Sequence, residues 1–396
     1  MDNYNKYKFE PGKVLVDLNK NCTYPDIPTN HDHPIFAGIE VEKVEILFAP
    51  QNQTKTDIGA VLLIQLKSKK KKAVVDAIKK LMANPLVVYA EPDYYMNTYI
   101  IPNDPYYGYL WGMDNIKAPL AWDHITGSSE IVIGVVDSGI DYNHPDLNNN
   151  MWIAPANQGI FGWDFYRNNR DPMDRTGHGT HVAGTIGAIG NNLIGVTGVC
   201  WDIKLAALKI GGNSNRVETA AAIKAIDYSN KNNIPILNNS WGGRAYSVSL
   251  KFAIENYNGL FIAAAGNNGS NNDRIPTYPA SYTSDNIISV AAINQNNNLT
   301  SFSNYGFASV DIAAPGFSIL STILNGGYGY KNGTSMAAPH VAGAAALLKV
   351  YRPDLTSLEI KEIILSGVDK QPGLSGRILS EGTLNLNKMI GCIVER

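Results

Sequence analysis

The sequence predicts an α/β fold in which helices cover both faces of a mostly parallel sheet, preceded by a smaller α+β domain. From about residue 130 onward, short apolar runs alternate with helical patterns, which is typical of parallel strands joined by crossover helices. Residues 1–98 instead hold strand-like runs such as "KVLVDL" and "GAVLLIQL" around one helical stretch, "KKAVVDAIKKLMANP". This order favours a separate two-layered unit.

Length and composition are those of an ordinary globular chain. Its 396 residues are enough for two or three domains, or for one large domain with an appendage. The hydrophobic share is 44%, the charged share is 17% and the net charge is −2, so nothing indicates binding to nucleic acid or to an anionic membrane. No apolar run is long enough for a transmembrane helix.

The cysteines and the N-terminus leave the cellular compartment open. Cys22, Cys200 and Cys392 are far apart and odd in number, which argues against a disulfide framework. The first residues, "MDNYNKYKFEPGKVLVDLNK", lack the apolar core and the cleavage site of a signal peptide. We expect the chain to be secreted if a signal has been removed from it, and cytoplasmic otherwise.

A boundary between the two domains is expected near residue 98. The stretch "MNTYIIPNDPYYGY", residues 96–109, has two prolines and no helical or strand periodicity, so it predicts an exposed linker. We therefore assign residues 1–98 and 99–396 to different domains.

Strands and helices alternate along the larger domain. The predicted strands are 131–140, 202–210, 234–243, 260–270, 287–293 and 310–316, and the predicted helices are 180–190, 216–233, 249–260 and 335–351. Nearly continuous apolar strands of this kind are buried on both faces of a parallel sheet. In such folds the loops at the carboxyl ends of the strands carry function.

Three polar turns of the larger domain each hold a candidate catalytic residue. Asp137 in "VVDSGI" ends the first strand, His178 in "TGHGTHVAG" begins a helix, and Ser335 in "NGTSMAAPH" begins the long apolar helix. A serine hydroxyl is a poor nucleophile that needs an imidazole to take its proton, and the imidazole needs a carboxylate to orient it. Taken singly, Asp137 could cap a helix and Ser335 could start one.

Two further residues bear on this interpretation. The Asn267 amide in "AAAGNNGS" could donate a hydrogen bond to the oxyanion of a tetrahedral intermediate, with the Ser335 N–H as second donor. Alternatively, Asn267 is a turn residue with an unusual backbone angle. His181 lies three residues after His178, so the pair could reach a metal. No glutamate accompanies them as in H-E-x-x-H, and a zinc site is the weaker interpretation.

Several long segments, in one order, resemble the subtilisin-like serine proteases. "VVDSGIDYNHPDL", "GHGTHVAGTI", "NNSWGG", "AAAGNNGS" and "NGTSMAAPHVAG" match that family's signature segments in the Asp, His, Ser order, over roughly residues 100–370. The stretch "WDHITGSSEIVIGVVDSGI" is most similar to the thermitase-like branch. The resemblance implies a serine endopeptidase that acts through an acyl-enzyme. Asp137 would orient His178, His178 would be the general base and acid, Ser335 the nucleophile, and Asn267 would serve the oxyanion.

The same resemblance implies that residues 1–98 are a propeptide, a ferredoxin-like α+β domain that acts as intramolecular inhibitor and folding chaperone. Its tail, "YAEPDYYMNTY", would lie in the substrate cleft, and self-cleavage is expected between Tyr94 and Asn103. The enzyme would then be a self-processed zymogen. Its expected partners are polypeptide substrates and its own propeptide, and we expect it to be a monomer.

The resemblance also implies a substrate cleft. In the family, "SWGG" and "AAAG" wall the pocket for P1, the residue before the scissile bond, "TYPAS" closes its base, and residues 211–217 match the edge strand that pairs with substrate. No acidic residue occurs at the pocket positions, which favours a large apolar P1 side chain over Lys or Arg. Trp241 stands where the family usually has a smaller aliphatic residue. The residues expected to bind substrate are Ser240, Trp241, Gly242, Ala264, Gly266, Thr277, Asn215 and Val217.

A structural calcium ion is implied as well. "HPDL" and the loop "IGNNLIGV", residues 189–196, resemble the family's calcium-binding segments, and oxygen ligands of this kind suit a hard cation. The expected ligands are the side chains of Asp104, Asp146 and Asn192 and the backbone carbonyls of Ile189, Ile194 and Val196. A second site near Asp164, Asp171 and Asp174 stays open, because Arg167 stands where the thermitase-like branch has an acidic ligand.

Two other functions are compatible with the same fold. A catalytically silent subtilisin-like protein could act as a binding partner, but such members usually lose a triad residue, and this chain keeps all three. A peptide ligase or cyclase would need a water-poor cleft or an extra capping segment, and the sequence has no obvious insertion of that kind.

Overall fold

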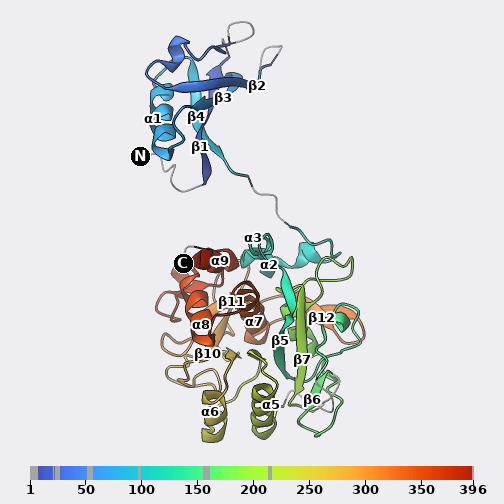
Figure 1. Ribbon diagram of the computed structural model, residues 1–396. Helices are drawn as coiled ribbons and strands as arrows, with labels where there is room; N and C mark the ends of the chain where they lie inside the picture. Colours follow the sequence, from blue (N-terminus) through green and yellow to red (C-terminus); the bar gives the residue numbers. More distant parts are fainter. Residues whose placement is uncertain are drawn as a thin grey trace. The chain divides into compact units, whose positions relative to one another are not determined.

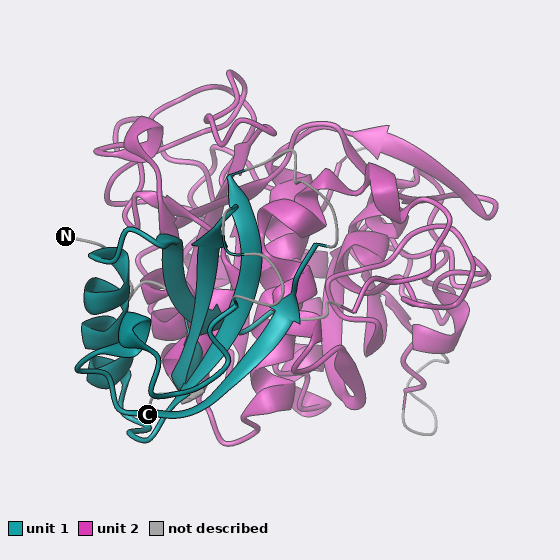
Figure 2. Cartoon of the chain, turned by 90° about the horizontal axis from the view of Figure 1, so that it is seen from above, with its two compact units in different colours: residues 1–98 teal, residues 99–396 magenta. Residues whose placement is uncertain are grey.

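The structure is a computed structural model that describes residues 8–20, 22, 27–50, 57–96, 100–154, 161–212 and 216–394 (Figure 1). The chain divides into two compact units, residues 1–98 and 99–396, which Figure 2 draws in different colours. Each unit has its own hydrophobic core. Within the described ranges, no helix is long and apolar enough to cross a membrane.

Unit 1 is a four-stranded sheet with one long helix. The strand order is β2-β3-β1-β4 and all neighbours run antiparallel. Alternate residues of β1, including Val14 and Val16, are buried together with Val74 and Ile78 of α1. A 3-10 turn, Pro34–Phe36, lies between β1 and β2, where a ferredoxin-like domain has its first helix. The elements are β1 (Phe9–Asn19), β2 (Val41–Phe48), β3 (Ile58–Leu66), α1 (Lys71–Met82) and β4 (Val87–Tyr94).

Unit 2 is built on a nine-stranded sheet in the order β14-β15-β11-β10-β9-β8-β5-β7-β6. Neighbouring strands are parallel except for β14 and β15 at one edge. A separate hairpin consists of β12 (Ile319–Ile323) and β13 (Gly327–Lys331). The sheet strands are β5 (Gly127–Asp137), β6 (Gly162–Asp164), β7 (Asp202–Lys209), β8 (Ile236–Asn239), β9 (Leu260–Ala264), β10 (Ile287–Ile293), β11 (Ile312–Pro315), β14 (Asp369–Lys370) and β15 (Gly382–Thr383).

Helices lie on both faces of this sheet, which confirms the predicted α/β fold. Along β5, Ile133 and Val135 face the core shared with α4, α7, α8 and α9, whereas Val136 faces the core shared with α5 and α6. This alternation is what a strand buried on both faces requires. The helices are α2 (Trp111–Asn115), α3 (Ala118–Trp122), α4 (His178–Gly187), α5 (Thr219–Lys231), α6 (Val248–Glu255), α7 (Thr334–Tyr351), α8 (Ser357–Ser366) and α9 (Leu386–Val394).

Helix α7 is buried along most of its length, as its apolar sequence predicts. It packs against the central strands β5 and β8 to β11 and against α4. Small residues let α7 pack closely against its neighbours: a Cβ added at Gly343 would lie only 2.5 Å from the Cβ of Val199, in the loop after α4. The packing holds the first turn of α7 at the carboxyl edge of the sheet.

The stretch 100–109 is largely exposed, as predicted, but it is bonded to the rest of unit 2 and is not a free linker. The Ile100 N–H donates to Asp123 Oδ1 at 2.8 Å, and the Tyr106 N–H donates to the Gly195 carbonyl at 2.8 Å. Asp104 is only 4% exposed and accepts a hydrogen bond from the Asn191 N–H at 2.7 Å. The segment therefore belongs to unit 2, with Pro105 in a turn that leads into a 3-10 helix, Tyr107–Tyr109.

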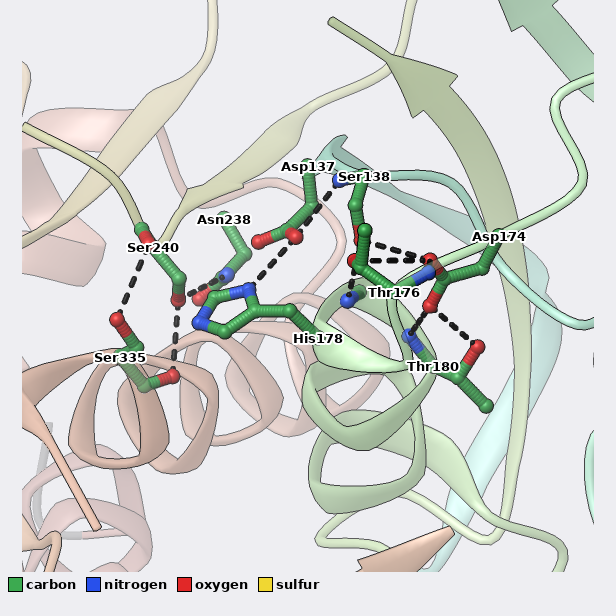
Figure 3. Close-up of polar contacts among 10 residues, drawn as sticks. Asp137, Ser138, Asp174, Thr176, His178, Thr180, Asn238, Ser240 and Ser335 are labelled. Carbon is green, nitrogen blue, oxygen red and sulfur yellow. Dashed lines mark hydrogen bonds and ion pairs between the residues drawn. The ribbon is translucent and has the colours of Figure 1, made fainter. Parts of the chain in front are cut away.

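A buried carboxylate, Asp174, joins the end of β5 to the start of α4. Its Oδ1 accepts hydrogen bonds from Ser138 Oγ at 2.9 Å and from the Thr176 N–H at 2.9 Å. Its Oδ2 accepts from the N–H of Thr180 at 3.0 Å and from the Thr180 hydroxyl at 2.8 Å (Figure 3). Burial alone would raise the pKa of Asp174, but these hydrogen bonds outweigh it and hold the pKa below 3.8.

Replacing Asp174 with Ala should lower the free energy of unfolding of unit 2 by about 3 kcal/mol, because the buried donors of Ser138 and Thr180 lose a charged acceptor. The pKa of Asp174 is lower in the folded state, so its contribution is present above about pH 4 and is lost as the pH falls further. Urea titrations at several pH values, followed by tryptophan fluorescence, measure both effects, because every tryptophan lies within residues 99–396.

The matched control is Asp227→Ala, which removes an exposed carboxylate paired with Lys231 and should cost less than about 0.5 kcal/mol. An Asp174→Ala protein as stable as this control at neutral pH would contradict the proposal that Asp174 stabilises the junction between β5 and α4.

Candidate active site

One cleft of about 650 Å³ opens at the carboxyl ends of β5, β8 and β9. Because these strands are adjacent and parallel, the loops that follow them meet at the same edge of the sheet. Asp137 ends β5, Asn267 follows β9, and the first turns of α4 and α7 supply His178 and Ser335. The structure thus brings the four predicted catalytic residues to one cleft.

Asp137 and His178 are directly hydrogen-bonded. Asp137 Oδ1 lies 2.7 Å from His178 Nδ1 and also accepts the Ser138 N–H at 2.7 Å (Figure 3). The carboxylate is 4% exposed, whereas the imidazole is 30% exposed to the cleft. A Cβ at Gly179 would lie 2.1 Å from the Gly139 carbonyl, so this glycine lets the start of α4 pack closely against the turn after β5.

The protonation of His178 is set by competing effects. Burial lowers the pKa of the imidazole, and the nearby positive charge of Lys331 acts in the same direction. The carboxylate of Asp137 outweighs both, through its charge and its hydrogen bond, and raises the pKa above 6.5. Asp137 therefore both orients the ring and stabilises its charged form.

Ser335 lies in the first turn of α7, beside the loop after β8. Its hydroxyl donates to the Ser240 carbonyl at 3.1 Å, and the Ser240 hydroxyl donates back to the Ser335 carbonyl at 2.9 Å (Figure 3). Among the hydrogen bonds of the described residues, none joins Ser335 Oγ to His178. Such bonds are often long or absent in a substrate-free site.

Asn267 is oriented by the residue that precedes Ser335. Its Oδ1 accepts the Thr334 N–H at 2.8 Å and the Thr334 hydroxyl at 3.0 Å. Because these two bonds identify the oxygen of the Asn267 amide, the other terminal atom is the nitrogen, Nδ2, which is a hydrogen-bond donor. Nδ2 lies next to the turn at Gly333. The Ser335 N–H has no carbonyl within its own helix to bond, because it belongs to the first turn.

The residues predicted to bind substrate also line this cleft, with one exception. Asn215 lies outside the residues that the structure describes. The others lie around the cleft beside the candidate catalytic residues: Ser240, Trp241, Gly242, Ala264, Gly266, Thr277 and Val217. Arg216, which lies in the predicted substrate-pairing segment 211–217, also lines the cleft, and so does Arg244, which was not predicted to bind substrate. Arg244 follows directly on "SWGG", so its position along the sequence could have indicated it.

Two buried carboxylates meet at the predicted calcium loop. Asp146 is 0% exposed and Asp104 is 4% exposed, and no described ion pair involves either of them. Asn192 Nδ2 donates to Asp146 Oδ1 at 2.8 Å, and the Val196 N–H donates to Asp146 Oδ2 at 2.9 Å. Burial raises the pKa of Asp146 to about 6, and the neighbouring Asp104 acts in the same direction.

The remaining predicted calcium ligands lie in the same loop. The Ile189 N–H donates to the Asp146 carbonyl at 2.9 Å, and the Ile194 N–H donates to Asn192 Oδ1 at 2.7 Å. The structure thus gathers two carboxylates, an amide and the backbone of one loop. Oxygen donors of this composition fit a calcium ion.

The weaker metal interpretations find no support in the described residues. His181 is buried and its Nε2 bonds to the carbonyls of Ile319 and Gly329, so it does not join His178 in a metal site. Near the second predicted calcium site, the buried ammonium of Lys209 already lies close to Asp164 and Asp174. Within the described ranges, no group of three or more His, Cys, Asp and Glu side chains could hold a metal.

Comparison with known proteins identifies the family of this chain. Residues 128–382 match the model of the subtilase family. The thermophilic serine proteinase of Bacillus sp. (strain AK1) is 41% identical over 313 residues, which are 78% of this chain and 74% of that protein. Thermitase of Thermoactinomyces vulgaris is 37% identical over 293 residues, which are 73% of this chain and 99% of thermitase.

A solved protease structure is also similar to this chain. It is described as proteases from Pseudoalteromonas arctica PAMC 21717 and matches with a TM-score of 0.65 at 29% identity, covering 74% of this chain and 99% of that chain. The fold, the cleft and the relatives lead to one conclusion: the chain belongs to the subtilase family and is a subtilisin-like serine endopeptidase.

Proposed function

We propose that Asp137, His178 and Ser335 form the catalytic triad of this endopeptidase and that Asn267 serves its oxyanion. The observation that carries the proposal is the 2.7 Å contact between Asp137 and His178 in a cleft that Ser335 also lines. A buried carboxylate, a partly exposed imidazole and a hydroxyl at a helix N-terminus are the parts that serine-dependent acyl transfer needs.

The reaction proceeds through an acyl-enzyme. Ser335 Oγ turns from the Ser240 carbonyl, passes its proton to His178 Nε2 and attacks the carbonyl carbon of the scissile bond. Asp137 holds Nδ1 and stabilises the imidazolium, which then protonates the leaving amine. A water molecule, deprotonated by His178, hydrolyses the ester and releases the second product.

The negative charge of the tetrahedral intermediate is stabilised by two donors, the Ser335 N–H and Asn267 Nδ2. The support is the anchoring of Asn267 Oδ1 by Thr334, which leaves Nδ2 as the free end of the amide. Donors that are already oriented need no reorganisation during the reaction, and losing one of them typically costs about 10²–10³ in turnover.

We further propose that residues 1–98 are a propeptide and intramolecular inhibitor, and that the enzyme processes itself between Tyr94 and Asn103. The support is that residues 1–98 form a compact unit with a core of their own. P1 is a large apolar residue, because the pocket formed by Trp241, Gly242 and Gly266 has no acidic side chain among its described lining residues except Asp137, which is bonded to His178.

A calcium ion would be held by Asp104, Asp146 and Asn192 and by backbone carbonyls at Ile189, Ile194 and Val196. The ion would supply positive charge to two buried carboxylates, Asp104 and Asp146, which both accept hydrogen bonds from the loop 189–196. Its role is structural, since it would tie the segment around Asp104 to the loop that follows α4.

Replacing Ser335 with Ala should abolish self-processing and reduce peptide hydrolysis by about 10⁶-fold, because the attacking oxygen is gone. Purified wild type incubated alone should yield two fragments separated within residues 94–103, identified by mass spectrometry, while Ser335→Ala stays intact. Trace wild type added to Ser335→Ala should cut it in the same segment, which shows that the segment is accessible. Self-maturation of pure Ser335→Ala would contradict the proposal.

The pH dependence of kcat/KM should follow His178. Activity needs the neutral imidazole, so it should rise with pH through a pKa above 6.5. In Asp137→Asn the carboxylate that raises this pKa is lost, so the residual activity should rise at lower pH, with kcat reduced by about 10⁴-fold. A midpoint that does not move in Asp137→Asn would rule out control of His178 by Asp137.

Removing calcium should lower the melting temperature of the processed enzyme. Chelation leaves Asp104 and Asp146 buried without a positive partner, and thermal unfolding with EDTA and with excess calcium measures the difference. Asp146→Asn is the matched variant: its melting temperature should respond far less to calcium. An unchanged melting temperature in the wild type after chelation would refute the calcium proposal.

A further inference from the structure

The cleft carries an excess of positive charge. Among its described lining residues the basic side chains are Arg216 and Arg244, and the one acidic side chain, Asp137, is bonded to His178. None of the described ion pairs involves Arg216, Arg244 or Lys331. The whole chain has a net charge of only −2, so this excess is local to the cleft.

Arg244 is held at the mouth of the P1 pocket. Its Nη1 donates to the carbonyls of Ile275 at 2.6 Å and Pro276 at 3.3 Å, and its Nη2 donates to Ser270 Oγ at 3.3 Å. These partners are neutral, so the guanidinium is positioned but keeps its full charge. It lies between the pocket wall at Gly243 and the segment that leads to Thr277.

Two further basic side chains lie near this site, one in the cleft lining and one outside it. Arg216 lines the cleft and is exposed, and its neighbour Val217 is bridged to Gly211. Lys331 is not a lining residue, but it ends β13 only four residues before Ser335. Its charge lowers the pKa of His178, although Asp137 outweighs this effect. Walls of low dielectric constant focus such a field on a bound peptide.

The segment that joins the two units has the opposite character. No Lys or Arg occurs between Lys80 and Lys117, whereas Glu91, Asp93, Asp104 and Asp114 lie in that stretch. Glu91 and Asp93 immediately precede the processing region proposed above. The first bond that a self-processing enzyme would cut is thus preceded in the sequence by two acidic residues and by no basic one after Lys80. Of the two, Asp93 lies 3.9 Å from Lys13 in unit 1.

We propose that Arg216, Arg244 and Lys331 make this cleft a cationic substrate groove, which selects polypeptide segments with Glu or Asp near the scissile bond and rejects segments with Lys or Arg there. The inference rests on the endopeptidase function proposed above and narrows its substrate class. It is compatible with a large apolar P1 residue, because the charges lie at the mouth and flanks of the pocket.

The test uses three peptides that share one apolar P1 residue and differ in the flanking residues, which are Glu, Gln or Lys. For the processed wild type, kcat/KM should fall in the order Glu, Gln, Lys, with about a tenfold ratio between Glu and Lys at low ionic strength. Because the charges are exposed, added salt should reduce the ratio.

Arg244→Gln, Arg216→Gln and Lys331→Gln should each reduce the Glu to Lys ratio, and Arg244→Glu should reduce it further. The matched control is Lys231→Gln, a surface lysine of α5 outside the cleft, which should leave the ratio unchanged.

The Gln peptide, which carries no flanking charge, separates the endopeptidase mechanism from the cationic substrate groove. Failure of the wild type to cleave it more than Ser335→Ala does would overturn the endopeptidase mechanism. Cleavage of all three peptides at equal rates, or a ratio that survives all three substitutions, would overturn the cationic groove.

Discussion

The close packing of α7 against the parallel sheet determines where the chemistry can occur. The adjacent strands β5, β8 and β9 end at one edge of the sheet. Helix α7 packs across these strands, and its first turn lies at that edge. Small residues along α7 allow close packing, since a Cβ added at Gly343 would lie 2.5 Å from the Cβ of Val199, in the loop after α4. A larger side chain at Gly343 would push α7 away from this loop and would displace Ser335, which begins the same helix.

The polar residues at this edge are arranged around buried charge. Asp137 and Asp174 are both nearly inaccessible, and each is stabilised by hydrogen bonds from the start of α4 or from Ser138. Ser138 links them, since its N–H donates to Asp137 and its hydroxyl donates to Asp174. Two carboxylates thus hold β5 and α4 together, and His178 is positioned by that junction. The same arrangement orients the imidazole and stabilises its charged form.

Periodicity and motif order were sufficient to predict strands β5 and β7 to β11, helices α4 to α7 and the meeting of Asp137, His178, Asn267 and Ser335. Short edge strands such as β6 and the β12–β13 hairpin were not predicted. Helix α8 was also missed, although Thr356 and Glu359 form a capping box at its start. Residues 100–109 were taken as a linker because they hold two prolines and show no helical or strand periodicity. No local pattern shows the hydrogen bond from the Asn191 N–H to Asp104. Only the family resemblance, which implied that Asp104 is a calcium ligand, indicated that this segment meets the loop 189–196. Lys331 was missed because only the fold brings its charge near His178, whereas Arg244 could have been found from its position directly after "SWGG".

The central claim is that Ser335, activated by His178, is the attacking residue, and covalent labelling tests it most directly. Two other serines, Ser138 and Ser240, line the same cleft and offer a real alternative. The wild type should be treated with a fluorophosphonate probe, digested, and mapped by mass spectrometry. The account predicts one adduct, on Ser335, formed faster as the pH rises through the pKa of His178. An adduct on Ser138 or Ser240, or labelling of a Ser335→Ala protein at the wild-type rate, would contradict it.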